Sequence, residues 1–154
     1  MDDFEIEHGH DDYELDELLE QAQANAQAFL LANVAYLRQS GAPLTAWAEA
    51  IGARFAMGWG DPRPWDAGEF LDAMLTNYRA FGAEVRDVDL AVDHAEAVIG
   101  PFPDPELCAY LGLPPDAADP FHDVPAAIAA PRALSWSWSR SGEEVRLQVD
   151  KHDS

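Results

Sequence analysis

The two halves of the sequence carry different hydrophobic periods, and this change constrains the fold more than any other feature. From Asp12 to Ser40 there is no Pro or Gly, and apolar residues recur at spacings of three and four, as on one face of a helix. Near the C-terminus apolar residues alternate with polar ones, which is typical of strands with one buried face. The pattern predicts a single α+β domain over residues 12–152, with a helical half (12–82) and a half built on β-hairpins (83–152).

Three helices are expected in the first half. Gly41 and Gly82 follow the first and the third, as Gly often does at the C-terminal end of a helix. Asp66 and Glu69 resemble a capping box at the start of the third. The second helix has large side chains beside small ones, which lets it lie close against a neighbour; the small ones are Ala48, Gly52 and Ala56. The expected ranges are 12–40, about 45–58 with Thr45 as N-cap, and from Asp66 to Gly82.

Two β-hairpins are expected in the second half. The first joins residues 84–91 to 95–100, and the second has the alternating residues Leu134, Trp136 and Trp138 on one strand and Val145, Leu147 and Val149 on the other. Asp104 and Pro105 predict the start of a short helix between them. One hairpin alone is marginal in water, so we expect the two to form a small antiparallel sheet with the three N-terminal helices packed on one face.

The net charge excludes some classes of partner. Twenty-nine acidic residues against nine basic ones give a formal charge of −20. A nucleic-acid binder needs clustered Lys and Arg to neutralise phosphates, and an anionic lipid surface would repel this chain. No apolar run reaches the roughly 18 residues that a membrane span needs. The sequence therefore predicts neither a nucleic acid nor a membrane as partner.

Half of the net charge lies in the first twenty residues, which hold ten acids and no base. Like charges repel one another, so we expect residues 1–11 to form an acidic mobile tail, either simply solvated or docking on a basic protein partner. This start has neither the basic region nor the apolar core of a signal peptide, and the single cysteine, Cys108, cannot form an internal disulfide. The expected location is the cytoplasm.

The aromatic residues allow two interpretations. The chain has five Trp, seven Phe and four Tyr, which either form the core or line a cavity between the helices and the sheet. Such a cavity suits a small apolar or aromatic molecule, with Met57 and Met74 adding plasticity and Tyr36, Asn77 and Arg79 adding polar groups. The ring residues expected to bind the ligand are Trp47, Phe55, Trp59, Tyr78, Trp136 and Trp138.

Few residues suggest catalysis. Cys108, His122 and Asp123 would make a cysteine hydrolase if they converged; otherwise Cys108 is a small buried residue and Asp123 a helix cap. His8, His10, Asp11 and Asp12 carry metal-ligating groups, but a mobile tail gives them no fixed geometry. The sequence has no zinc, Fe–S, P-loop or G-x-S-x-G motif. We therefore expect no metal site and no cofactor, and regard an enzyme as less favoured.

The layout of residues 83–149 resembles a known family. A hairpin (AEVRDVDLAVDHAEAVIG) precedes a Pro-rich entry (PFPDPEL), a short helix (CAYLGL), a His-Asp loop (FHD) and a terminal hairpin (LSWSWSRSGEEVRLQV). This order is similar to that of 4-vinyl-reductase small-molecule-binding domains and of L-2-amino-thiazoline-4-carboxylic acid hydrolase-like proteins. The resemblance implies a ligand cavity between helices and sheet. It assigns no catalytic residue.

Three functions remain open on the sequence. The first is a small-molecule-binding or sensory domain with an aromatic pocket. The second is an acidic interaction or assembly protein that acts through its tail and an aromatic surface, including as a homodimer paired through the stripe of the first helix. The third is the cysteine-dependent hydrolase.

Overall fold

A computed structural model describes residues 2–152 of the chain, with side chains for residues 14–152. It is an α+β fold of helices and one antiparallel sheet. The helices are α1 (Asp2–Ser40), α2 (Leu44–Met57), α3 (Ala67–Ala80), α4 (Pro105–Tyr110) and α5 (Val124–Ala129), with short 3-10 turns η1 (Asp119–Asp123) and η2 (Ala130–Arg132). The strands are β1 (Val85–Leu90), β2 (His94–Ile99), β3 (Leu134–Ser141) and β4 (Glu144–Lys151).

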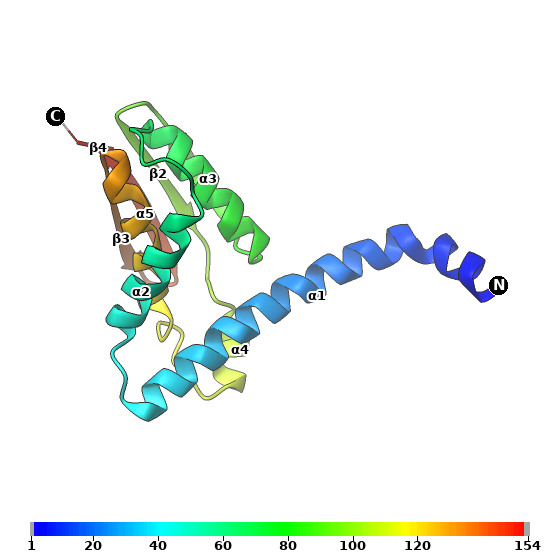
Figure 1. The fold of residues 1–154 in the computed structure, drawn as a ribbon. Helices are drawn as coiled ribbons and strands as arrows, with labels where there is room; N and C mark the ends of the chain where they lie inside the picture. Colours follow the sequence, from blue (N-terminus) through cyan, green and yellow to red (C-terminus); the bar gives the residue numbers. More distant parts are fainter. Residues whose placement is uncertain (1, 153–154) are drawn as a thin grey trace.

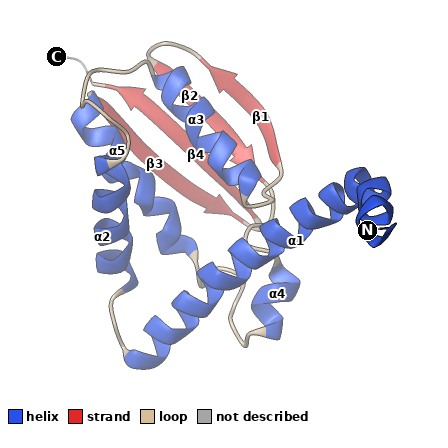
Figure 2. Ribbon diagram, turned by 45° about the vertical axis from the view of Figure 1, so that its right-hand side comes forward, coloured by secondary structure: helices blue, strands red, loops and turns tan. Residues whose placement is uncertain are grey.

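The four strands form one sheet in the order β1-β2-β4-β3, with every neighbouring pair antiparallel (Figure 2). Both predicted hairpins are present, and the pairing of β2 with β4 joins them. On β4 Val145, Leu147 and Val149 are buried, whereas Arg146 is exposed, as the alternation predicts. The sequence pattern therefore identifies the face of the sheet that carries the core.

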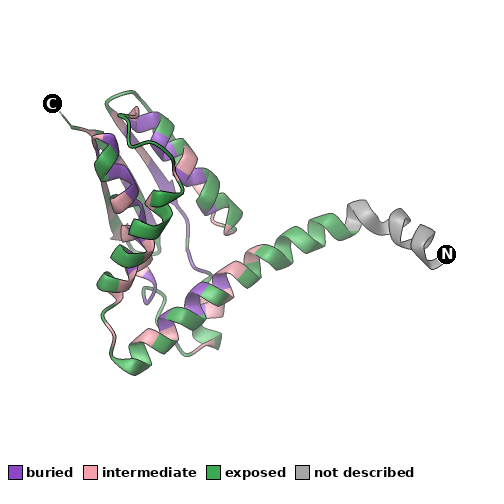
Figure 3. Ribbon diagram, viewed as in Figure 1, coloured by how far each residue is buried: buried purple, intermediate pink, exposed green. Residues whose placement is uncertain are grey.

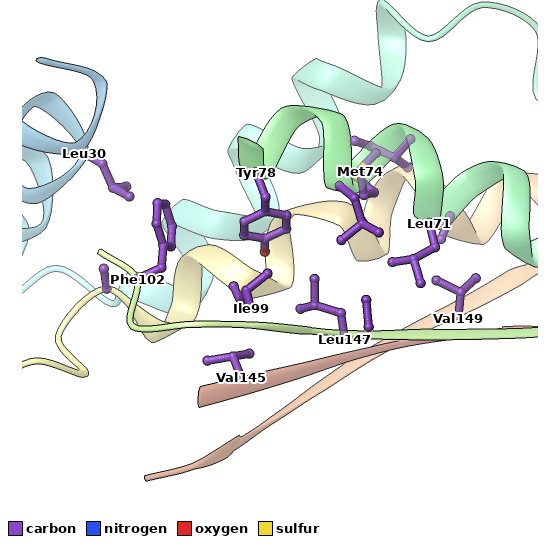
Figure 4. Close-up of a cluster of buried hydrophobic side chains, with 14 of the residues drawn as sticks. Leu30, Leu71, Met74, Tyr78, Ile99, Phe102, Val145, Leu147 and Val149 are labelled. Atoms are coloured by element: carbon purple, nitrogen blue, oxygen red, sulfur yellow. The ribbon is translucent and has the colours of Figure 1, made fainter. Parts of the chain in front are cut away.

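The core lies between the sheet and α3. Figure 4 shows Leu71, Met74 and Tyr78 of α3 directed toward apolar residues of β2 and β4. α3 packs on β1, β2 and β4, and α5 packs on β3 at the same face (Figure 2). The space between helices and sheet, where the sequence predicts a cavity, is thus occupied by buried side chains.

α1 departs from the expected arrangement of three helices on the sheet. Its N-terminal half extends away from the rest of the molecule (Figure 1), and residues 14–22 are exposed (green in Figure 3). Only the part around Gln27, Leu31 and Val34 is buried, where Gln27 donates to the carbonyl of Phe81 (2.7 Å) and accepts from the backbone N–H of Asp104 (2.8 Å). The helical pattern predicts a helix over 12–40, whereas α1 begins at Asp2. The pattern also does not show that residues 14–22 of this helix are exposed.

The predicted caps are partly correct. The Asp104 carboxylate accepts from the backbone N–H of Glu106 at 3.0 Å and caps α4 as expected. Asp66 holds the cap position of α3 but makes no side-chain capping bond, and α2 begins at Leu44 after Pro43 rather than at Thr45. The predicted acidic tail, residues 1–11, and the metal-ligating groups of residues 8–12 lie outside the residues whose side chains the structure describes.

Candidate functional site

A cleft lies between α2, α3 and the η1–α5 segment, and it is lined by residues of all three. Its volume is about 390 Å³, within the range of small-molecule sites. α2 packs on α5 and η1, which leaves the space beside α3 open. The lining is mainly apolar and includes Phe55, Trp59, Met74, Tyr78, Phe81 and Phe121.

Three of the six ring residues predicted to bind a ligand lie at this cleft. Phe55 and Trp59 come from the C-terminal end of α2, and Tyr78 comes from α3. Phe55 is 54% exposed. In the sequence Phe55 and Trp59 are four residues apart, the spacing of residues on one helical face.

The other three predicted rings do not line the cleft and lie partly buried against the core. Trp136 donates through its indole N–H to the carbonyl of His122 (2.6 Å), and Trp138 donates to the Asp123 carboxylate (2.7 Å). Trp47 is partly buried against the core. Trp47, Trp136 and Trp138 therefore fit the core interpretation better than the cavity interpretation. The alternation along a strand shows which face is buried, but it does not show what covers that face.

A buried arginine supports the Trp59 wall. Arg132, which is 1% exposed, donates to the carbonyl of Ile128 (2.8 Å) at the end of α5. Its guanidinium lies 5.8 Å from the centroid of the Trp59 ring and 5.9 Å from that of Trp65. Such cation–π contacts hold the indole in place beside the cleft. Nothing in the sequence singles out Arg132, because its role depends on long-range packing.

Tyr78, which lines the cleft, belongs to a buried polar pair with His122. A hydrogen bond of 2.7 Å joins the Tyr78 hydroxyl to Nδ1 of His122, and the two rings are stacked. Burial raises the pKa of the Tyr78 hydroxyl and lowers the pKa of His122 to about 4. Both groups are therefore neutral near pH 7, and Nε2 of His122 has no hydrogen-bond partner within residues 14–152.

Polar groups at the cleft are few. Asn77 contributes an exposed amide that donates to the carbonyl of Ala73 in its own helix (3.1 Å). Arg54 is the charged residue of the lining, and it forms no ion pair with the described side chains. Tyr36, Met57 and Arg79, which the sequence suggests as further lining residues, are not part of it. Phe81, Phe121 and Arg54 are lining residues that the sequence does not predict. Phe81 follows α3, Phe121 lies in the short turn η1, and Arg54 lies in the last turn of α2.

The side chains proposed for a hydrolase are not hydrogen-bonded to one another. Cys108 is buried in α4, and burial raises the pKa of its thiol, which disfavours the thiolate needed for nucleophilic attack. Within residues 14–152 the His122 ring bonds to Tyr78, and Asp123 accepts from Trp138 instead of capping α5. This arrangement offers no activated nucleophile.

The described residues contain neither a candidate metal centre nor a helix that could span a membrane. No group of three His, Cys, Asp or Glu side chains among residues 14–152 is placed to hold a metal ion. Within residues 2–152 no helix has both the length and the apolar composition to cross a bilayer.

Comparison with protein-family models, curated proteins and solved structures gives no match for this chain. The resemblance to vinyl-reductase-like domains therefore stays an expectation from sequence layout.

Proposed function

We propose that this chain binds a small, largely apolar molecule in the cleft between α2, α3 and α5, as a ligand-binding or sensory domain. The observation that carries the proposal is a cleft of about 390 Å³ with aromatic walls in a molecule whose core is otherwise filled. When the apolar surface of a ligand displaces water from an apolar cleft, the free energy of the system falls, and this favours binding. The proposal keeps the predicted ligand class and places its site between α2, α3 and α5, with no residue of the sheet in the lining.

Arg54 suggests an acidic group on the ligand. The chain has a formal charge of −20, yet the charged residue lining the cleft is a cation with no ion-pair partner among the described residues. A guanidinium at the rim attracts a carboxylate or sulfonate while the apolar body of the ligand contacts Phe55 and Trp59. An apolar or aromatic acid thus fits this lining better than a neutral hydrocarbon.

Two dyes with the same aromatic body test both parts of the proposal. 1-Anilinonaphthalene-8-sulfonate carries an anionic group, and N-phenyl-1-naphthylamine does not. We expect Asn77→Trp, which fills the cleft, to weaken binding of both dyes by about tenfold or more, because it displaces their shared ring system. Thr76→Trp is the matched control, since Thr76 is the exposed neighbour on α3 that does not line the cleft.

The charge is tested separately. Arg54→Gln should weaken the sulfonate dye by about two- to fivefold, as expected for an exposed ion pair, and leave the neutral dye unchanged. Arg38→Gln, which removes a charge from the last turn of α1, should change neither. If Asn77→Trp binds each dye as tightly as the wild type does, the cleft is not the binding site. If Arg54→Gln weakens the binding of both dyes equally, only the acidic group on the ligand is rejected.

A further inference from the structure

α1 carries a row of apolar side chains that residues 14–152 leave exposed. We name this row the α1 stripe: Leu15, Leu18, Leu19, Ala22, Phe29 and Tyr36, all of them exposed. Phe29 is 74% and Leu18 is 63% exposed. Leu31 and Val34, which contact the rest of the molecule, are fully buried on another side of the same helix. Contiguous exposed apolar surface of this kind indicates an interaction site.

The stripe has two different ends and a narrow middle. Its N-terminal end holds leucines, its C-terminal end holds Phe29 and Tyr36, and Ala22 and Ala26 lie between. At 1.5 Å per residue, Leu15 and Tyr36 are about 32 Å apart along the axis. Small residues in the middle let a second helix approach closely there, while large residues on both sides fill the flanking contacts.

The distribution of charge along α1 favours one relative direction for two paired copies of this helix. The leucine end also holds Glu14, Asp16, Glu17 and Glu20, whereas residues 21–37 contain no charged side chain at all. Two copies in parallel would place acids beside acids. Two antiparallel copies place the acidic end of each beside the uncharged segment of the other, which avoids the repulsion.

We propose that the α1 stripe is the interface of a homodimer in which two α1 helices pair antiparallel around a two-fold axis near Ala26. Each leucine end then packs against the Phe29 and Tyr36 end of the other copy, so that the same patch serves both protomers, as an isologous interface requires. Because one helix pair is small beside most stable interfaces, we expect dissociation on the order of micromolar concentrations. This inference does not depend on the ligand cleft.

Sedimentation velocity of the full chain over a range of micromolar concentrations tests the dimer. The wild type should shift from monomer to dimer mass as concentration rises. Leu19→Glu combined with Phe29→Glu should raise the dissociation constant at least tenfold. Ala24→Glu, on another exposed side of α1, adds the same charge outside the stripe and should leave dimerisation unchanged.

Disulfide cross-linking tests the direction. Ala26→Cys lies near the proposed axis and should cross-link to its copy, whereas Leu15→Cys should not, because an antiparallel pair separates the two Leu15 positions by about 30 Å. The native Cys108 is buried and does not compete. Efficient cross-linking of Leu15→Cys would overturn the antiparallel pairing.

A different occupant would also be recognised. A chain that stays monomeric at all concentrations overturns the homodimer, and co-sedimentation of that monomer with phosphatidylcholine vesicles would assign the stripe to a lipid surface. A dimer that the double glutamate variant does not weaken would place the interface elsewhere.

Discussion

α1 and α3 both have a row of apolar residues on one face, but this row is buried in α3 and largely exposed in α1. α3 buries Phe70, Leu71 and Leu75 completely against the sheet, whereas α1 leaves Leu15, Leu18 and Phe29 more than half exposed. The two apolar rows have the same spacing in the sequence. Hydrophobic period therefore predicts that a helix forms and which side is apolar, but not whether that side is covered by its own chain.

The sharpest test of this contrast truncates one phenylalanine on each helix. Phe70→Ala should lower the free energy of unfolding by about 3–5 kcal/mol, because it removes a fully buried ring and leaves a cavity. Phe29→Ala should change it by less than about 0.5 kcal/mol when measured below the dimerisation range. Urea unfolding followed by circular dichroism measures both. A similar cost for the two variants would contradict the exposed placement of Phe29.

The buried pair of Tyr78 and His122 should make the free energy of unfolding depend on pH. Burial lowers the pKa of His122 to about 4 in the folded chain, against about 6.5 when it is unfolded. The unfolded chain therefore binds the extra proton first, so stability attributable to His122 is complete above pH 6.5 and falls, by roughly 3 kcal/mol, as the pH drops toward 4.

His122→Asn isolates this contribution, because an amide can still bond to the Tyr78 hydroxyl but does not titrate. The difference in unfolding free energy between wild type and variant should shrink as the pH falls from 7 to 4. A difference that stays constant over that range would mean that His122 is not buried as described.

The packing of α2 on α5 gives a third, smaller effect. A Cβ at Gly52 would lie 2.6 Å from the carbonyl oxygen of Val124, so Gly52→Ala must push the two helices apart and should cost about 1–3 kcal/mol. Gly58→Ala is the matched control, since its nearest neighbour is the carbonyl of Phe55 at 3.5 Å. Thermal unfolding compares them, and an unchanged midpoint for Gly52→Ala would argue against close contact of α2 with α5.

His94 should have the smallest effect on stability, and its pH dependence should have the opposite sign to that of His122. It lies on the open face of the sheet, where a hydrogen bond to Asp150 (2.7 Å) and a second to Glu96 (3.4 Å) raise its pKa. Its stabilising contribution is therefore complete below pH 6.5 and is lost as the pH rises through the higher folded pKa.

An NMR titration of the imidazole checks this. Asp150→Asn should bring the pKa of His94 down toward its ordinary value, while Asp93→Asn, which removes an acid next to it in sequence, should have little effect. If Asp150→Asn leaves the titration unchanged, the bond between His94 and Asp150 does not form in solution.

Sequence patterns predict the elements better than the site. The alternation in Leu134–Ser141 and Glu144–Lys151 identifies both strands of the last hairpin, because two-residue periodicity follows from local geometry. The same alternation cannot show that Trp136 and Trp138 are held by bonds to His122 and Asp123, which come from a separate turn. The cleft depends on where α2 lies relative to α3, and no local pattern specifies that distance.

The measurement that tests the ligand-binding proposal most directly is an NMR titration of the five indole N–H signals with 1-anilinonaphthalene-8-sulfonate. Trp59 lines the cleft, whereas Trp136 and Trp138 do not line it and donate their indole N–H groups to His122 and Asp123. The proposal predicts a saturating shift of the Trp59 signal with the signals of Trp136 and Trp138 almost unmoved. Larger shifts at Trp136 and Trp138 than at Trp59, or no shift at any indole with excess dye, would contradict it.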